Sequence, residues 1–243
     1  MQLIKAAVVL VSPLLLPSPP LLLSATPPRC TPRAVVTSTG TDSAATNELS
    51  ARATSVTRKW IKDFVIRLGL CPYAAEAFNT DGQIRYATSF ATDEEELVSD
   101  FFNEAALLLD TPAKECATTM LTAPRYEGGI EEFYALYEWL ADLLEDDDEP
   151  ILGNQVQPAF FHPDWTFAGL EAQAAVHFEK RSPYPVINLL RRATLDQVVQ
   201  AGLDRGVIVN KQIAEHNAAS LEREGFAALE ECFRELHDRP RRS

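Results

Sequence analysis

Residues 84–123 read IRYATSFATDEEELVSDFFNEAALLLDTPAKECATTMLTA and contain, in succession, the signals of a strand, a helix and a second strand. The first strand candidate spans 84–91 and the second spans 117–123. Between them, the apolar side chains over 97–109 recur at the three- and four-residue spacing of an amphipathic helix. This order predicts two parallel strands that are joined by a right-handed crossover.

Capping boxes mark where two helices are expected to begin. In the first, Thr92 is the predicted N-cap and Glu95 stands three residues later. In the second, Thr194 and Gln197 have the same spacing. In such a box the hydroxyl accepts a hydrogen bond from a backbone N–H of the first turn, and the acid or amide bonds back to the N-cap. We therefore expect helices to start at these two threonines.

Strands and helices also follow one another outside this unit. Apolar residues at helical spacing predict helices over 56–68, 130–144 and 207–237, and further strand candidates span 156–161 and 186–190. We therefore predict an α/β or α+β fold. It has a small, mostly parallel sheet of about four strands flanked by helices, and a helical carboxy-terminal region.

Composition and charge narrow the class of protein. The chain has 243 residues, of which 46% are hydrophobic and 23% charged, as in a soluble globular protein. Lys and Arg number 22 against 35 Asp and Glu, so the formal net charge is −13. This charge argues against nucleic acid and anionic membrane surfaces as main partners, because both attract concentrated basic residues. The sequence also lacks glycine-rich phosphate loops, a His-Glu-x-x-His zinc motif and a Gly-x-Ser-x-Gly motif.

The first 50 residues have the composition of a targeting leader. Residues 1–25 combine Lys5 with an apolar stretch and small residues, as in a secretory signal, and 26–40 contain no acid, as in a transit peptide. Together they resemble the bipartite leaders of algae with complex plastids. A plastid is the first expectation; a mitochondrion, the secretory pathway and an error of gene prediction are the alternatives. We predict one domain over 51–238 and a basic tail, 239–243, with no integral membrane segment in the mature chain.

Cys71 is the first candidate for chemistry. It precedes Pro72, and because proline is common at the first position of a helix, we expect Cys71 at a helix N-cap. Backbone N–H groups and the helix dipole would stabilise a thiolate there and lower the pKa of the thiol. The alternative is a small buried thiol that packs between two helices. Cys116 and Cys232 are too distant in sequence to suggest a disulfide framework or a four-cysteine zinc site.

His162 is the second candidate. It follows the predicted strand 156–161, and ligand crevices of open α/β sheets form where strands end. Pro163 prevents a helix from continuing there. His162 is therefore a candidate base or ligand, and the alternative is a structural histidine bonded to the backbone.

A basic island in this acidic chain is the third candidate. Arg181 and Ser182 stand before the strand candidate 186–190, and Arg191 follows it. A guanidinium offers a planar pair of donors to a carboxylate or phosphate, so these residues are candidates for binding an anionic substrate. The alternative is that they pair with the many acids of the chain itself.

The chain resembles a family, found mainly in bacteria, that is known only as domain of unknown function 1415. The resemblance extends from about Trp60 to Gly225. It rests on the motifs LCPYA at 70–74, TTML at 118–121 with Pro124, FHP at 161–163, FAG at 167–169, RSPYP at 181–185 and LLR at 189–191. It implies no activity, only that Cys71, His162, Arg181 and Arg191 are the positions of interest.

Two positions depart from that family's pattern, and the first is Tyr73, where the family favours phenylalanine. The second has more consequence for chemistry. The family pattern has histidine before Leu-Leu-Arg, where this chain has Asn188. If that histidine were a metal ligand or a base, this chain would be impaired or would have a different activity.

Three hypotheses follow. The first is a thiol-dependent enzyme for a small anionic or peroxide-like substrate, with Cys71 as nucleophile, His162 as base or orienting group, and Arg181 and Arg191 stabilising negative charge. The second is a non-catalytic binding or assembly protein of an organelle, with haem or a metal on Cys71 and His162 as second ligand. The third is a purely structural role for these motifs. The sequence requires no cofactor and does not predict the oligomeric state.

Overall fold

The structure, a computed structural model, describes residues 40–145, 151–206 and 208–237. Most of the predicted leader, part of the acidic segment before Pro150 and the basic tail lie outside the described residues. The elements are, in order, α1 (Gly40–Trp60), η1 (Ile61–Ile66), α2 (Ala74–Asn79), β1 (Ile84–Thr88), α3 (Glu94–Asp110), β2 (Thr118–Thr122), α4 (Ile130–Glu145), η2 (Ile151–Asn154), β3 (Val156–Phe161), η3 (Ala175–Glu179), β4 (Val186–Arg191), α5 (Arg192–Leu203), α6 (Val209–Glu224) and α7 (Phe226–His237). Helix α1 thus begins before residue 51, where the sequence predicts that the domain starts.

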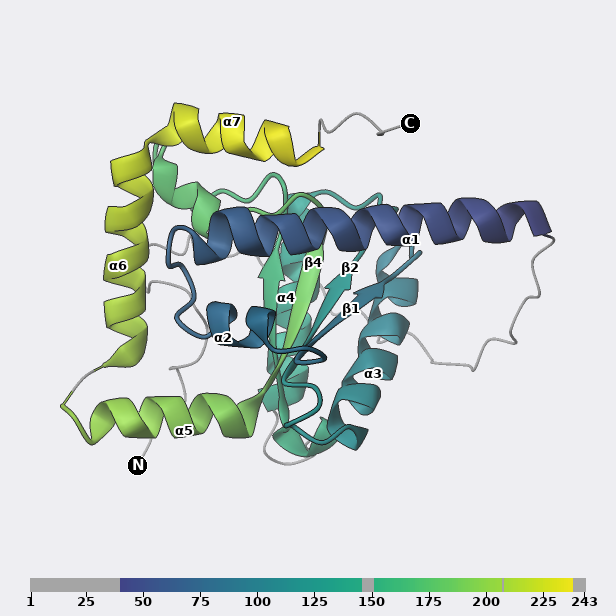
Figure 1. The fold of residues 1–243 in the computed structure, drawn as a ribbon, viewed down its shortest axis with the longest axis horizontal. Helices are drawn as coiled ribbons and strands as arrows, with labels where there is room; N and C mark the ends of the chain where they lie inside the picture. The colour runs from purple at the N-terminus through teal and green to yellow at the C-terminus, as the bar shows by residue number, and fades with distance from the viewer. Residues whose placement is uncertain (1–39, 146–150, 207, 238–243) are drawn as a thin grey trace, which may run out of the picture.

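Four strands form one sheet in the order β1-β2-β4-β3 (Figure 1). β1 and β2 pair in parallel, with Ile84 beside Thr118, as residues 84–123 predict. β4 pairs antiparallel with β2 on one side and with β3 on the other. β1, β2 and β3 therefore run in one direction, and β4 runs between β2 and β3 in the opposite direction.

The α/β class, the sheet of four strands and the helical carboxy-terminal region are confirmed; where a mostly parallel sheet was expected, the sheet is mixed, with one parallel and two antiparallel pairs. The reason is the connection from β3 to β4, which contains only the short η3. Such a connection does not carry the chain back along the sheet, so β4 starts where β3 stops, with Val186 beside Phe161. β3 is an edge strand, which accommodates Pro158 because an edge position does not need every backbone N–H.

Helices cover both faces of the sheet (Figure 1). α3 and α4 pack on one face, where Leu121, Phe160 and Ile187 belong to the same buried cluster as Phe101 and Phe133. Neighbouring strand residues point to opposite faces, so Met120 belongs to a second cluster, with residues of η1, α6 and α7. In the part of the chain that the structure describes, no helix is both long and apolar enough to cross a lipid bilayer.

Helix α3 begins one residue later than predicted. Asp93 is its N-cap and accepts a hydrogen bond at 2.9 Å from the backbone N–H of Glu96. The Glu96 carboxylate in turn accepts one at 3.3 Å from the backbone N–H of Thr92. The sequence Thr-Asp-Glu-Glu-Glu contains two overlapping capping boxes, and the one with a charged cap next to the positive end of the helix dipole forms.

Helix α5 has no side-chain cap, so the predicted cap at Thr194 is wrong. The helix begins at Arg192, directly after β4. The backbone N–H of Arg192 donates to the carbonyl oxygen of Gln155 at 2.9 Å, so a neighbouring loop satisfies one N–H of the first turn.

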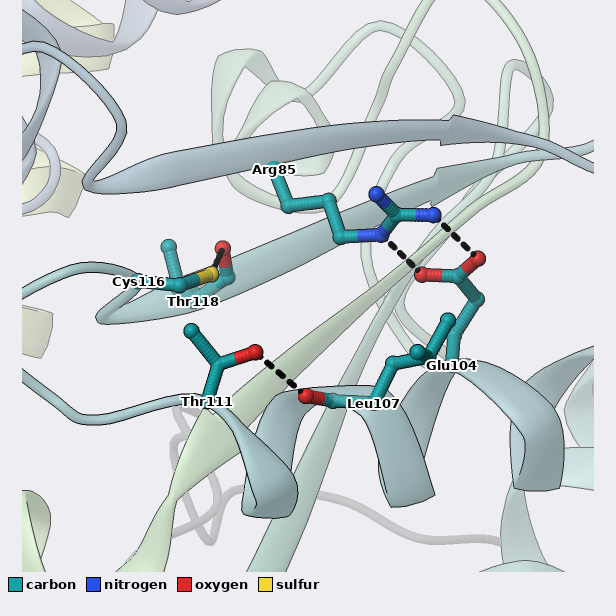
Figure 2. Close-up of polar contacts among 6 residues, drawn as sticks. All are labelled: Arg85, Glu104, Leu107, Thr111, Cys116 and Thr118. Carbon is teal, nitrogen blue, oxygen red and sulfur yellow. Dashed lines mark hydrogen bonds and ion pairs between the residues drawn. The ribbon is translucent and has the colours of Figure 1, made fainter.

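A surface ion pair connects β1 with α3 (Figure 2). Arg85 donates from Nε and Nη2 to the two carboxylate oxygens of Glu104, at 2.6 and 3.0 Å. The side chain of Arg85 is half exposed, so we expect the pair to contribute about 1 kcal/mol or less. The pair joins α3 to β1, which is the edge strand of the parallel pair.

Candidate functional site

A cavity of about 230 Å³ lies on the face of the sheet that α2 covers. Its floor includes Met120, Ala159 and Asn188 of the three adjacent strands, and its walls come from η1, α2, α5 and α6. Figure 1 shows these helices around that face, with α2 between α1 and α5 and with α6 along one side. Most of the side chains that line the cavity are apolar. The few polar groups in it are therefore the candidates for chemistry.

Lys180 is the buried cation of this cavity. It follows η3 directly, only 3% of its surface is exposed, and its ammonium lies 5.1 Å from the ring centre of Phe161. Burial lowers the pKa of Lys180 to about 8, although the neighbouring Glu179 acts in the opposite direction. Among the described residues, the ammonium has no hydrogen-bond or ion-pair partner within 4 Å.

Glu179 lines the same cavity and is held by Asn217 of α6. The side-chain amide of Asn217 donates to the Glu179 carboxylate at 3.0 Å. Burial raises the pKa of Glu179, while this hydrogen bond and the charge of Lys180 lower it. A buried acid and a buried amine from adjacent positions thus share one apolar cavity.

Two residues that line the cavity each carry a buried polar atom that lacks a partner. The indole N–H of Trp60 and the amide oxygen of Asn217 are buried, and neither has a hydrogen bond among the described residues. Leaving such an atom unsatisfied costs about 1–3 kcal/mol. Because both residues line the cavity, a ligand whose polar end reaches these atoms would supply the missing partners.

Cys71 lines the cavity, but not as the helix N-cap that the sequence predicts. Tyr73 is the N-cap of α2, because Cys71, Pro72 and Tyr73 form a turn before the helix, in which the Cys71 carbonyl accepts from Ala74. The predicted lowering of the pKa is also wrong. Burial raises the pKa of the Cys71 thiol, and hydrogen bonds from the backbone of Tyr73 and Ala74 offset this only in part.

His162 lies outside the cavity, against α4. Its ring packs on Phe133 with 5.4 Å between ring centres, and Nδ1 accepts a hydrogen bond at 3.2 Å from the backbone N–H of Asp164. Burial lowers the pKa of His162. These contacts are those of a structural histidine, which was the alternative at this position, and they do not bring His162 to Cys71.

The basic island that was predicted to bind an anion is occupied by the protein itself. Arg181 donates to the carbonyl oxygen of Trp165 at 3.0 Å, and its guanidinium lies 4.7 Å from the ring centre of Phe178. Ser182 is fully buried and donates to the carbonyl oxygen of Tyr184. Neither residue lines the cavity.

Arg191 reaches the cavity wall, but its guanidinium binds the backbone. It donates to the carbonyl oxygens of Leu108, Thr111 and Cys116. Leu108 stands in the last turn of α3, where carbonyl groups lack a partner within the helix. Arg191 therefore ties the end of α3 and the start of β2 to β4, and these donors are not available to a ligand.

Asn188, where the resemblance leads one to expect histidine, is part of the cavity floor. Its amide oxygen accepts a hydrogen bond at 2.6 Å from the Thr118 hydroxyl of the neighbouring strand. A change of residue type here changes the chemistry of the cavity directly.

The thiol and imidazole that the sequence suggested as haem or metal ligands do not meet. Cys71 lines the cavity, and His162 packs against α4. Within the described ranges, no group of three or more His, Cys, Asp or Glu side chains is arranged to hold a metal ion.

The sequence did not identify Lys180, Glu179 or Asn217 as site residues. Lys180 stands directly before Arg181 of the basic island, and its sequence neighbours give no sign that it is buried. Asn217 stands in a polar helix, and its contact with Glu179 joins residues that are 38 positions apart. Only folding places these three residues around the same cavity.

Comparison with known proteins identifies the family of the chain. The family model described as "Protein of unknown function (DUF1415)" matches residues 52–231, most of the chain. No curated protein and no solved structure matches the chain.

Proposed function

We propose that this chain, which belongs to the DUF1415 family of proteins of unknown function, is an enzyme. Its cavity suggests that the substrate is a small, largely apolar molecule with one polar end. The observation that carries the proposal is the buried amine of Lys180, without a hydrogen-bond or ion-pair partner in the described chain, in a cavity of about 230 Å³. Buried titratable groups in a cavity are typical of active sites, because burial adjusts their pKa to the reaction.

The polar atoms suggest how the substrate is held. The Trp60 indole N–H needs an acceptor and the Asn217 amide oxygen needs a donor. A substrate whose polar end offers both satisfies the two atoms, while its apolar part contacts side chains such as Phe161 and Phe178. Lys180 and Glu179 then exchange protons with the bound molecule.

A matched series of probes tests this binding. Hexanamide offers both a donor and an acceptor, hexanoate offers only acceptors, and hexane offers neither. We expect hexanamide to raise the thermal unfolding midpoint most. At ten times its Kd the gain is roughly 1.4 kcal/mol, or roughly 3–5 °C in a domain of this size. If hexane stabilises the protein as much as hexanamide does, the polar groups do not hold a ligand.

Two variants of α2 localise the effect. Ala77 lines the cavity, whereas Ala75 of the same helix does not. We expect Ala77→Phe to abolish the shift by filling the cavity, and Ala75→Phe to leave it in place. Equal shifts in both variants would place the binding site elsewhere.

Thiol chemistry on Cys71 is the second candidate, because Cys71 lines the same cavity and its sulfur receives hydrogen bonds from two backbone N–H groups. In this mechanism a peroxide-like or otherwise electrophilic molecule, anionic or neutral, enters the cavity and Cys71 attacks it. Lys180 then stabilises negative charge, the role that the sequence analysis gives to Arg181. Complete loss of turnover in Cys71→Ser, with only a reduced rate in Lys180→Met, would favour Cys71 over Lys180 as the nucleophile.

The location proposed for the protein is a plastid, and this rests on the leader alone. Residues 26–40 contain no acid and follow an apolar stretch, as in a signal followed by a transit peptide. A fluorescent protein fused behind residues 1–50 tests it in an alga with complex plastids. Fluorescence that stays in the cytosol would contradict the proposal.

A further inference from the structure

The amine of Lys180 has the surroundings of a nucleophile. It stands in an apolar cavity beside the Phe161 ring and is 3% exposed. Burial disfavours the ammonium form and lowers the pKa of Lys180 to about 8, so a larger share of this amine is uncharged at neutral pH than of an exposed lysine. The uncharged amine has a free electron pair, and desolvation in an apolar cavity is a known means of activating lysine.

We propose that Lys180 forms a Schiff base with an aldehyde or ketone bound in this cavity, which makes the substrate a small, largely apolar carbonyl compound. The inference rests on the proposed function and names the substrate class of the same site. The amine nitrogen forms a bond to the carbonyl carbon, and the electron pair of the C=O π bond moves to oxygen. The two amine protons leave with that oxygen as water when the C–O bond breaks, so the products are an imine and one water molecule.

Glu179 supplies the proton transfers that this condensation needs. It lines the same cavity, is adjacent to Lys180 in sequence, and has a pKa raised by burial. Its carboxyl group carries the two amine protons to the carbonyl oxygen, one after the nitrogen attacks and one as the C–O bond breaks, and ends in the state in which it began. Asn217 holds the carboxyl group at 3.0 Å, which makes it a positioning residue.

The charges in the cavity favour a neutral carbonyl compound over an organic anion. Lys180 and Glu179 offset one another, and the Arg191 guanidinium is used by backbone carbonyl groups. The carbonyl oxygen accepts from the indole N–H of Trp60 before the attack, and the hydroxyl of the carbinolamine can donate to the amide oxygen of Asn217. Both unsatisfied atoms thus gain partners along the reaction.

Reductive trapping tests the inference in the full chain. Hexanal is the probe, and cyanoborohydride reduces a protonated imine to a stable hexyl-lysine that peptide mass spectrometry locates. At pH 7 we expect Lys180 to be labelled at least ~10-fold faster than Lys211, whose side chain is 70% exposed, because of the larger uncharged fraction. Lys180→Met should lose this adduct alone. Glu179→Gln should slow labelling of Lys180 but not of Lys211.

The labelling rates of Lys180 and Lys211 are compared within the wild-type protein, so this test holds even if a variant does not fold. Labelling of Lys180 no faster than of Lys211 would overturn the Schiff base. If hexanamide still stabilises the protein and Ala77→Phe abolishes that effect, the proposed binding function survives this failure. If hexanamide has no effect either, both proposals fall together.

Discussion

The backbone N–H of His162 donates a hydrogen bond to the carbonyl oxygen of Lys180 at 3.0 Å. Two stretches that the sequence marks as candidates therefore meet, but through their backbones. The His162 ring packs on Phe133 under α4, and the Lys180 side chain extends along Phe161 into the cavity on the other face. The histidine thus supports the backbone of a buried lysine and does not itself line the cavity.

The first prediction concerns the cost of burying Lys180. Its pKa is lowered from 10.5 to about 8, and each pKa unit corresponds to about 1.36 kcal/mol. We expect Lys180→Met to raise the free energy of unfolding at pH 7 by up to about 3 kcal/mol. Between about pH 8 and 10.5 the unfolded chain binds the proton and the folded protein does not, so the wild type gains stability and the difference shrinks.

Urea unfolding of both proteins at pH 7, 8.5 and 10 measures this difference. Lys211→Met, at an exposed position, is the control and should show no such trend. Other groups that titrate in this range are common to both proteins and cancel in the difference. A difference that stays constant from pH 7 to 10 would contradict the assignment.

The second prediction concerns the reactivity of Cys71. Because burial raises the pKa of its thiol, we expect iodoacetamide to alkylate Cys71 more slowly than free cysteine at pH 7. Peptide mass spectrometry resolves it from Cys232, which is also partly exposed and serves as the internal control. Alkylation of Cys71 faster than free cysteine below pH 7 would restore the thiol-dependent enzyme as the leading hypothesis.

The third prediction separates a structural from a ligand-binding arginine. Arg191→Lys keeps the charge but cannot reach the carbonyl oxygens of Leu108, Thr111 and Cys116 together. We expect a loss of about 2–3 kcal/mol in the free energy of unfolding, because buried carbonyl groups lose a charged donor. Arg67→Lys, in an exposed pair with Glu224, should cost less than about 1 kcal/mol.

Chemical denaturation of the two arginine variants gives the comparison. If Arg191→Lys is as stable as Arg67→Lys, the guanidinium does not hold these carbonyl groups. Its role would then have to be sought in the cavity that it borders.

The fourth prediction concerns the start of α3. We expect Asp93→Ala to cost about 1 kcal/mol of stability, because the backbone N–H of Glu96 loses its acceptor. Thr92→Ala should have a smaller effect, because only its backbone N–H takes part in the capping box. Equal losses in the two variants, measured by urea unfolding, would favour the cap at Thr92 that the sequence alone suggests.

Much of the fold follows from local patterns. The stripe over 97–109 requires a helix, and the strand candidates on either side require a crossover, so the parallel pair β1-β2 is predictable. The position of β4 is not predictable in the same way. The sequence pattern of a strand does not indicate its direction in the sheet. That direction, and hence the pairing, depends on where the preceding connection ends relative to the other strands.

The sequence by itself determined the order of strands and helices, the family, and a short group of suspect positions, because periodicity and motifs are properties of neighbouring residues. It also led to Cys71 and Arg191, which do border the cavity, although not in the roles first expected. Only the tertiary structure decided that Lys180 is buried, that Glu179 meets Asn217, and that Arg181 lies on an aromatic ring. Burial and the pKa it changes depend on what surrounds a side chain in three dimensions, and those surroundings come from distant parts of the chain.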